Sequence, residues 1–274
     1  MEKFLISVDM DDTFLTKDKT ITQESIEFVK KLVSDGHHFI INTGRPHQGA
    51  ISFLKSLGIH EPMIVNNGGA IVYYDENYQN VVDYHLFNLG LKGVIDFNKK
   101  IEHTLNCGTV TSIFDFYTTN LDKTPFWVIH RSENVKIHEG PIYTNLNTLP
   151  FLSEYYVKEE FEKEFEKVLS QTKYKNWNIT KWGNFDGQIT YEISSKNANK
   201  GKAMLYLAKK LKIKKENIIS FGDQLNDIPM LMMANYGVAM INSRDEVKEK
   251  AKFISEFDYN NNGVIEFIKK LLNN

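Results

Sequence analysis

Carboxylate side chains follow two apolar runs that lie far apart in this chain of 274 residues. Each run is long enough for one buried strand, and each stops at a pair of aspartates. The pairs are Asp9 and Asp11 after the first run, and Asp223 and Asp227 after the second. Because ligands of open α/β folds bind at the carboxyl ends of strands, we expect these side chains to meet there. Carboxylate and carbonyl oxygens are the ligands that Mg²⁺ prefers, so the sequence predicts a magnesium site.

Two further residues could hold an anionic group beside that cation. Thr43 ends the next strand-like run and offers a hydroxyl and a backbone N–H, and Lys200 stands at the start of a helix-like segment. A phosphoryl group in transfer needs donors and cations around its equatorial oxygens. Taken singly, Thr43 fits a helix cap and Lys200 fits a solvated side chain. Their positions between the two acidic pairs favour binding of a phosphoryl group.

The first and last thirds of the chain alternate strand-like and helix-like segments. The expected strands cover residues 4–8, 38–42, 63–65, 217–221 and 237–240, with a hairpin over 71–82. The expected helices run from a cap at Thr22 to Gly36, from Pro46 to Gly58, and over 201–211, 228–233 and 264–272. Repeated strand–helix units indicate a parallel sheet with helices on both faces.

The middle of the chain has a different pattern. Its expected helices cover residues 91–103 and 158–169, and its strand-like runs cover 112–118, 126–129, 177–181 and 188–193. No strand there ends in acids, so this part has the pattern of an α+β insert. We therefore predict an α/β protein in which a Rossmann-like parallel sheet core, residues 1–82 and 191–274, carries an inserted cap domain, residues 83–190.

The bulk composition is that of an ordinary soluble protein, with 42% apolar and 25% charged residues. A net charge of −2 gives no reason to expect a nucleic-acid partner, which usually binds a basic patch. The lone Cys107 excludes an intrachain disulfide and fits a reducing compartment. No signal-peptide pattern and no apolar run of the ~18–20 residues that span a bilayer is found. A cytoplasmic protein without a membrane partner is expected, and its oligomeric state is left open.

Four motifs in this order resemble those of the haloacid dehalogenase superfamily, and in particular its Cof-type phosphatases with a C2-type cap. The motifs are Asp9-Met10-Asp11-Asp12-Thr13, Asn42-Thr43-Gly44-Arg45, Asn199-Lys200-Gly201 and Gly222-Asp223-Gln224-Leu225-Asn226-Asp227-Ile228-Pro229-Met230-Leu231. The resemblance covers essentially the whole chain. The insert falls where the subgroup has its cap domain.

The resemblance implies roles for the acids. Asp9 is expected to be the nucleophile that takes the phosphoryl group as an aspartyl-phosphate. Asp11 is expected to protonate the leaving oxygen and then to activate water. The implied Mg²⁺ ligands are the Asp9 and Asp223 carboxylates and the Asp11 backbone carbonyl, with Asp227 close by through a metal-bound water.

The resemblance also implies groups that bind the substrate's phosphoryl oxygens. The expected substrate-binding set is Thr43, Gly44, Arg45, Lys200 and Asn226, and the expected catalytic set is Asp9, Asp11, Thr43, Lys200 and Asp227. Thr13 would brace the first acidic loop. For Arg45, a contact with substrate or cap and a structural salt bridge are equally open.

Two residues depart from the family pattern. Asp12 stands where the family often has glycine, and Ile241 stands where many relatives have glycine. Asp tolerates tight turns better than most residues, so we expect little harm at Asp12. The bulk of Ile241 could reshape its loop.

The function implied is a Mg²⁺-dependent phosphatase that hydrolyses small phosphorylated metabolites, either sugar phosphates or phosphorylated cofactors. A phosphotransferase or phosphomutase on the same scaffold is one alternative. A non-catalytic sensor of a phosphorylated ligand is another. Cap residues are expected to choose the substrate, and the sequence does not show which of them do so.

Overall fold

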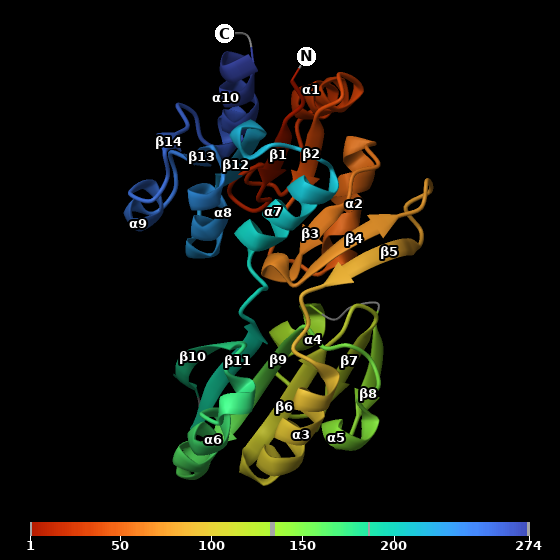
Figure 1. The fold of residues 1–274 in the computed structure, drawn as a ribbon, viewed down its shortest axis with the longest axis vertical. Helices are drawn as coiled ribbons and strands as arrows, with labels where there is room; N and C mark the ends of the chain where they lie inside the picture. The colour runs from red at the N-terminus through yellow and green to blue at the C-terminus, as the bar shows by residue number, and fades with distance from the viewer. Residues whose placement is uncertain (1, 132–134, 186, 273–274) are drawn as a thin grey trace. The chain divides into compact units, whose positions relative to one another are not determined.

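The computed structural model describes residues 2–131, 135–185 and 187–272. The chain forms two compact units (Figure 1). The core unit comprises Met1–His85 and Asn199–Asn274, and the insert unit comprises Leu86–Ala198. The chain therefore leaves the core unit and returns to it once.

A five-stranded sheet in the order β14-β13-β12-β1-β2 forms the centre of the core unit, and all of its pairings are parallel. Its strands are β1 (Leu5–Val8), β2 (His38–Ile41), β12 (Ile218–Gly222), β13 (Tyr236–Ala239) and β14 (Phe253–Ile254). Val8 pairs with both Ile41 and Phe221. The carboxyl ends of β1, β2 and β12 are therefore level, and the residues that follow them meet at one edge.

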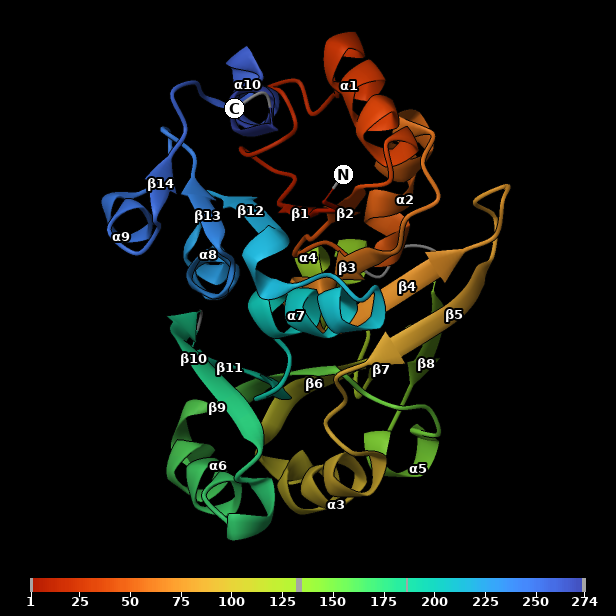
Figure 2. The ribbon, with the colours of Figure 1, turned by 45° about the horizontal axis from the view of Figure 1, so that its top comes forward.

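Helices cover both faces of this sheet, as the repeated strand–helix pattern predicted. Figure 2 shows α1, α2 and α10 on one side of the sheet and α7 and α8 on the other. The helices of the core unit are α1 (Gln23–Ser34), α2 (His47–Leu57), α7 (Lys200–Lys210), α8 (Ile228–Met233), α9 (Asp245–Lys248) and α10 (Gly263–Leu272). Thr22 caps α1 by accepting the Ser25 N–H, and Gly58 ends α2 with a φ of 61°. Pro46 directly precedes α2 rather than lying inside it.

A second, three-stranded sheet in the order β3-β4-β5 lies beside α2 in the core unit. Its strands are β3 (Met63–Val65), β4 (Ala70–Tyr74) and β5 (Val81–Leu86). The short turn Asn66–Gly68 joins β3 to β4, which pair antiparallel. An isolated parallel bridge between Asn42 and Ile64 connects this sheet with the end of β2.

The insert unit contains a six-stranded sheet in the order β10-β11-β9-β6-β7-β8. Its strands are β6 (Leu105–Thr111), β7 (Asp115–Thr118), β8 (Lys136–Glu139), β9 (Leu152–Lys158), β10 (Trp177–Phe185) and β11 (Gln188–Ser195). Three helices, α3 (Leu91–Ile101), α5 (Ile142–Asn145) and α6 (Glu162–Leu169), pack on this sheet around Phe97 and Phe165. The Phe97 ring makes edge-on contacts with Tyr155 and Trp177. The predicted fold class, a parallel α/β core with an α+β insert, is confirmed.

One predicted strand of the insert unit is wrong. Phe126–Ile129 belongs to the helix α4 (Phe126–Arg131). The Pro125 carbonyl accepts the N–H groups of Val128 and Ile129, and a proline at the start of a helix loses no backbone bond. Val128 packs in a buried cluster with Cys107 and Phe116. Tertiary packing therefore overrides the strand preference of this apolar run.

The division into units differs from the sequence-based boundaries at both junctions. Residues 83–85 belong to the core unit, and residues 191–198 belong to the insert unit. The second difference arises because β11 pairs with β9 over 188–194. That strand therefore stays with the insert sheet beyond residue 190.

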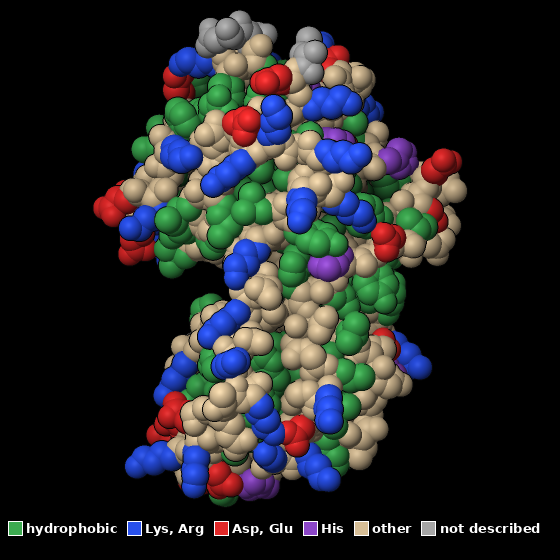
Figure 3. Space-filling model, in the orientation of Figure 1, with side chains coloured by type: hydrophobic (Ala, Val, Ile, Leu, Met, Phe, Trp, Pro, Cys, Tyr) green, Lys and Arg blue, Asp and Glu red, His purple; other side chains and the backbone are tan. Residues whose placement is uncertain are grey.

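No helix in the described part of the chain is long and apolar enough to cross a membrane. On the face seen in Figure 3, Lys and Arg side chains are interspersed with acidic, apolar and uncharged polar ones.

Candidate active site

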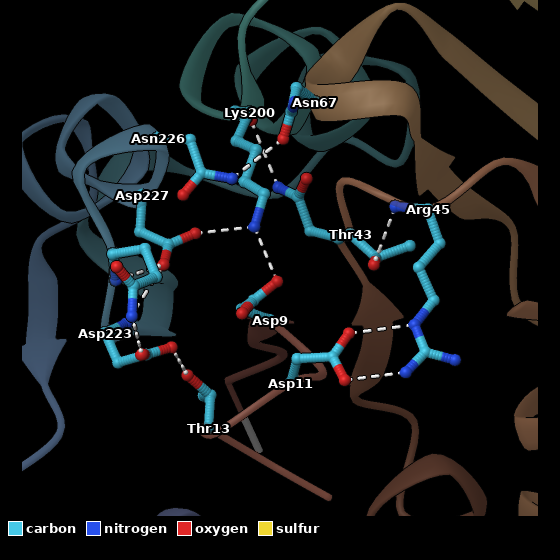
Figure 4. A network of polar contacts seen from close by, with 12 residues as sticks. Asp9, Asp11, Thr13, Thr43, Arg45, Asn67, Lys200, Asp223, Asn226 and Asp227 are labelled. Carbon is cyan, nitrogen blue, oxygen red and sulfur yellow. Dashed lines mark hydrogen bonds and ion pairs between the residues drawn. The ribbon is translucent and has the colours of Figure 1, made fainter. Parts of the chain in front are cut away.

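Three carboxylates converge at the carboxyl edge of the core sheet. Asp9 follows β1, Asp223 follows β12, and Asp227 lies just before α8. One oxygen of each lies within 4.8 Å of the others, and all three residues are buried. The two acidic strand ends, more than two hundred residues apart in the sequence, are therefore brought together as β1 and β12 pair (Figure 4).

Lys200 neutralises part of this cluster. It is the first residue of α7 and is fully buried. Its Nζ donates to Asp9 Oδ1 at 2.5 Å and to Asp227 Oδ1 at 2.6 Å. The neighbouring Asn199 caps α7 by accepting the Lys202 N–H. The helix start thus places the ammonium group between two of the three acids.

Protein donors hold three more oxygens of the cluster, Asp227 Oδ2 and both oxygens of Asp223. Asp227 Oδ2 accepts the backbone N–H groups of Asp223 and Gln224, both at 2.9 Å. Asp223 accepts Thr13 Oγ1 at 2.8 Å and Gln224 Nε2 at 2.7 Å. A Cβ at Gly222 would lie 2.4 Å from the Asp227 Cβ, so this approach requires glycine. Thr13 was expected to brace its own loop. Its hydroxyl also bonds Asp223, at the end of another strand.

The charge balance of the cluster fits a divalent cation. Burial raises the pKa of Asp9 to about 7, with Lys200 opposing the shift and Asp227 and Asp223 adding to it. Burial also raises the pKa of Asp223. For Lys200, burial works against the charged form, but Asp227 and Asp9 outweigh it and raise its pKa above the ordinary value. Three buried carboxylates face one ammonium, and their oxygens are the donors that hard cations prefer. The chemistry of these donors therefore suits a divalent metal ion.

Asp11 lies outside this cluster, in a different environment. Its side chain is 38% exposed, and Arg45 binds it with two bonds, Nε to Oδ2 at 2.8 Å and Nη2 to Oδ1 at 2.6 Å. Lys19 Nζ lies 3.1 Å from the same carboxylate. Burial alone would raise the pKa of Asp11, but Arg45 and Lys19 outweigh it and lower the pKa. Of the two roles left open for Arg45, the structure shows the salt bridge.

The remaining predicted residues gather around the turn that follows β3. Asn67 Oδ1 accepts Asn226 Nδ2 at 2.8 Å, and the Asn67 N–H donates to the Thr43 carbonyl at 3.1 Å. Thr43 is buried, and its Oγ1 accepts the Arg45 N–H at 3.1 Å. A Cβ at Gly44 would lie 2.9 Å from Asn67 Oδ1, so glycine allows the turn to come this close. The second motif and Asn226 are thereby joined through Asn67.

Three residues of the network were not assigned a role from the sequence: Lys19, Asn67 and Gln224. Gln224 lies within the fourth motif, so its position carried a signal. Asn67 comes two residues after the strand-like run 63–65, at the strand end where open α/β folds bind ligands. Lys19 carried none, because its contact with Asp11 depends on how the turn from Thr16 to Thr20 folds.

The two departures from the family pattern are accommodated. Asp12 has a φ of 56°, in the left-handed region that favours glycine. Its side chain lies 3.2 Å from Lys19 Nζ, and its carbonyl accepts Asn242 Nδ2 at 2.8 Å. Ile241 is not among the residues with a positive φ, and its N–H donates to Ser255 Oγ at 3.0 Å. Its loop therefore does not need glycine.

Comparison with known proteins identifies the family. The family model of haloacid dehalogenase-like hydrolases matches residues 6–268. The chain belongs to this family. The resemblance read from the four motifs, and the hydrolase class that it implied, are therefore confirmed.

Relatives of this hydrolase include named phosphatases. A 5-amino-6-(5-phospho-D-ribitylamino)uracil phosphatase from Bacillus subtilis is 28% identical over 271 residues, which cover 97% of each chain. A pyridoxal phosphate phosphatase from Escherichia coli is 25% identical over 259 residues, 91% of this chain and 92% of the relative.

Solved structures share the fold of this hydrolase. A haloacid dehalogenase-like hydrolase from Bacteroides thetaiotaomicron has a TM-score of 0.74 at 20% identity and covers 98% of this chain and 100% of its own. A protein from Thermotoga maritima has a TM-score of 0.75 at 22% identity, and the match covers 98% of this chain and 97% of the Thermotoga chain. At this level of identity the likeness concerns the fold, including both the parallel core and the insert.

Proposed function

We propose that this chain is a magnesium-dependent phosphatase that hydrolyses phosphate monoesters of small metabolites through an aspartyl-phosphate on Asp9. The observation that carries the proposal is the buried cluster of Asp9, Asp223 and Asp227, in which Lys200 binds one oxygen of Asp9. A carboxylate held against a cation at the edge of a sheet has the place and charge of a nucleophile for phosphoryl transfer. Family membership and the named phosphatases among the relatives support the same assignment.

Asp9 and Asp11 would divide the chemistry between them. In the first step an oxygen of Asp9 attacks phosphorus and the ester P–O bond breaks. Asp11 gives its proton to the departing oxygen, and because Arg45 and Lys19 favour its charged form, the minor protonated fraction of Asp11 does so. In the second step Asp11 takes a proton from a water molecule, whose oxygen attacks phosphorus. The bond between Asp9 and phosphorus then breaks, inorganic phosphate leaves, and both side chains return to their starting states.

The residues that would hold Mg²⁺ are the carboxylates of Asp9 and Asp223 and the backbone carbonyl of Asp11, with Asp227 adjacent. The ion supplies positive charge that lets an anionic phosphate approach three acids and that offsets charge on its oxygens. Lys200 adds a fixed positive charge beside Asp9, where its two short bonds hold it.

Uncharged donors would complete the phosphate site. We assign this role to the Thr43 hydroxyl, the Gly44 backbone N–H and the Asn226 side-chain amide. Asn226 is oriented by Asn67, which also binds the backbone of Thr43. Such donors bind phosphoryl oxygens without adding charge, and they need no reorganisation when they are already held by the fold.

The substrate class is small phosphorylated metabolites. Two relatives are named for the phosphates of a ribitylaminouracil and of pyridoxal, so a cofactor or a cofactor precursor heads the list of substrates to test. Sugar phosphates form the second group. A screen of such compounds with Mg²⁺, read out as released inorganic phosphate, tests the class directly.

Replacement of the nucleophile tests the mechanism. Asp9→Asn keeps the shape of the side chain but removes the negative charge of the oxygen that attacks phosphorus. We expect kcat to fall by at least about 10³-fold. EDTA should abolish activity and added Mg²⁺ should restore it. Asp35→Asn, which alters an exposed acid at the end of α1, is the matched control and should remain fully active. Full activity in Asp9→Asn would refute the nucleophile assignment.

The fate of the phosphoryl group separates hydrolysis from the two alternatives. Hydrolysis releases all of the label from a labelled substrate as inorganic phosphate, and an acid quench of Asp11→Asn should trap label on Asp9. Label that passes to an added sugar instead would indicate a phosphotransferase. Tight binding without turnover over the whole screen would indicate a sensor.

A further inference from the structure

Arg45 is held in place by several contacts at the start of α2. Its guanidinium carbon lies 5.2 Å from the centre of the Phe53 ring, and Nη1 donates to the Gly49 carbonyl at 3.4 Å. Its backbone N–H is bound by Thr43 Oγ1. Phe53 and Gly49 both belong to α2. The guanidinium is therefore fixed from one side by a helix, and its opposite side faces Asp11 (Figure 4).

The Asp11 carboxylate lies within reach of two charged side chains, Arg45 and Lys19. Arg45 occupies both oxygens, at 2.8 and 2.6 Å, in the forked geometry that matches a carboxylate. Lys19 Nζ also lies 3.1 Å from Oδ1. A half-exposed aspartate without such contacts would exchange rotamers freely, so these two residues define its orientation.

Lys19 reaches Asp11 from an uncommon backbone conformation. Its φ is 56°, in the left-handed region that favours glycine. The turn that contains it is closed by two bonds, Thr16 N–H to the Thr20 carbonyl at 2.9 Å and Lys19 N–H to the Thr16 carbonyl at 2.8 Å. Strained conformations of this kind gather at functional sites. Here the turn presents the ammonium to Asp11 and Asp12.

We propose that Arg45 and Lys19 are positioning residues that clamp the Asp11 carboxylate in the orientation it needs for proton transfer. This inference rests on the proposed function, which assigns the proton transfers to Asp11. It changes the role of Arg45, which the family resemblance placed among the substrate-binding residues. The reason is that the guanidinium already directs two of its nitrogens at Asp11 and a third at the Gly49 carbonyl. Arg45 therefore acts on the substrate through Asp11.

Substrates with different leaving groups distinguish positioning of an acid from binding of phosphate. p-Nitrophenolate leaves without a proton, whereas an alkoxide needs one. In Arg45→Met, which keeps an apolar stem over Phe53, kcat/KM for an alkyl phosphate should fall by about 10–100-fold, a part of what general acids contribute. For p-nitrophenyl phosphate the loss should stay below about threefold. Equal losses for both substrates, expressed as a higher KM, would show that Arg45 binds the phosphoryl group directly.

A double-mutant cycle with Asp11→Asn tests whether the two residues act as one unit. If Arg45 acts through Asp11, Arg45→Met should lower kcat/KM for the alkyl phosphate by less than about twofold in the Asp11→Asn background. Losses that multiply would overturn the proposal. Arg45→Lys keeps the charge without the fork and should show the same leaving-group pattern, so the test holds even where Arg45→Met folds poorly.

Lys19→Met should show the same pattern with a smaller loss, because one exposed ammonium restrains the carboxylate less than a fork does. Lys31→Met is the matched control. Lys31 is also an exposed lysine in an ion pair with an aspartate, Asp35 at 2.6 Å, but on α1. It should not change kcat/KM for either substrate. A Lys19→Met enzyme with wild-type rates on both substrates would remove Lys19 from the clamp.

A measurement that needs no activity separates the clamp from the proposed function. The Arg45 Nε–H should give a slowly exchanging ¹⁵N NMR signal in the wild type, because it is bonded to Asp11, and Asp11→Asn should speed its exchange by at least about tenfold. A signal that Asp11→Asn leaves unchanged refutes the clamp even in an active phosphatase. A wild type that hydrolyses no phosphate ester refutes the proposed function, whatever the NMR signal shows.

Discussion

Asp9 and Asp11 lie two residues apart and have opposite surroundings. Asp9 is 6% exposed, shares its site with two other carboxylates and is paired with a buried lysine. Asp11 is half-exposed and lies between Arg45 and Lys19. The pKa of Asp9 is raised and that of Asp11 is lowered. One residue type therefore has two different electrostatic properties within a single short loop.

The backbone explains how neighbours diverge so sharply. Asp9 still follows the sheet, since its N–H donates to the Phe221 carbonyl at 3.0 Å. The Met10 carbonyl then accepts the N–H groups of Phe14 and Leu15, which turns the chain away. The turn therefore leaves Asp9 with the other acids at the sheet edge and places Asp11 beside Arg45. A tight turn directly after a strand can separate two acids that the sequence writes almost side by side.

The largest effect should follow from removal of the buried cation. Lys200→Met leaves buried carboxylates without their partner, and loss of one member of a buried ion pair costs about 3–5 kcal/mol of unfolding free energy. Arg45→Met removes a partner from a half-exposed acid and should cost about 1 kcal/mol or less. Urea unfolding in EDTA measures both. Equal losses of unfolding free energy in the two variants would show that burial does not make the ion pair of Asp9 stronger than that of Asp11.

Metal binding should raise the unfolding free energy through the buried carboxylates and not through the Asp11 side chain. Mg²⁺ at 100 times its dissociation constant should raise the unfolding free energy by about 2.7 kcal/mol. Asp223→Asn should abolish this gain, whereas Asp11→Asn should retain it, because the expected ligand at Asp11 is the backbone carbonyl. Thermal unfolding with and without Mg²⁺ is the measurement. An unchanged gain in Asp223→Asn would remove that carboxylate from the metal site.

The pH dependence of stability without metal should have opposite signs for the two acids. The pKa of Asp9 rises from its ordinary 3.8 to about 7 on folding, so its contribution is fully present below pH 3.8 and is lost as pH rises through about 7. The pKa of Asp11 falls on folding, so its contribution is present above pH 3.8 and is lost as pH falls further.

Melting temperatures between pH 3 and 8 in EDTA, roughly the window of these shifts, test the two signs. Asp9→Asn should flatten the decline toward neutral pH, and Asp11→Asn should flatten the decline toward acid. If both variants changed the pH dependence of the melting temperature in the same way, the opposite pKa shifts of Asp9 and Asp11 would be contradicted.

The smallest effect is expected at Asp12, the residue directly after Asp11. Asp12→Gly removes the strain of a left-handed backbone conformation, which stabilises the fold. It also raises the conformational entropy of the unfolded chain and removes the contact with Lys19, which both destabilise the fold. These contributions oppose each other, so the unfolding free energy should change by less than about 1 kcal/mol. Activity should stay within about threefold of wild type, about 0.7 kcal/mol in the barrier. A much larger loss of activity would give Asp12 a chemical role that neither its motif position nor its contacts indicate.

Most core elements could be predicted because their signals are local. Thr22 and Gly58 mark helix ends through capping and a left-handed φ, which need no distant partner. The insert unit was harder to predict. α4 is a helix despite its strand-like run, because Val128 packs against Cys107 and Phe116, which are distant in sequence.

The site divides in the same way. The motifs alone predict that acids end two strands and that Thr43 and Lys200 lie between them in the chain, because spacing within a motif is a property of the sequence. The fold is needed to see that Asp9 is buried with Lys200 whereas Asp11 is paired with Arg45 and Lys19. Burial and ion pairing depend on groups that the fold brings together, and they set the charge and orientation of each side chain.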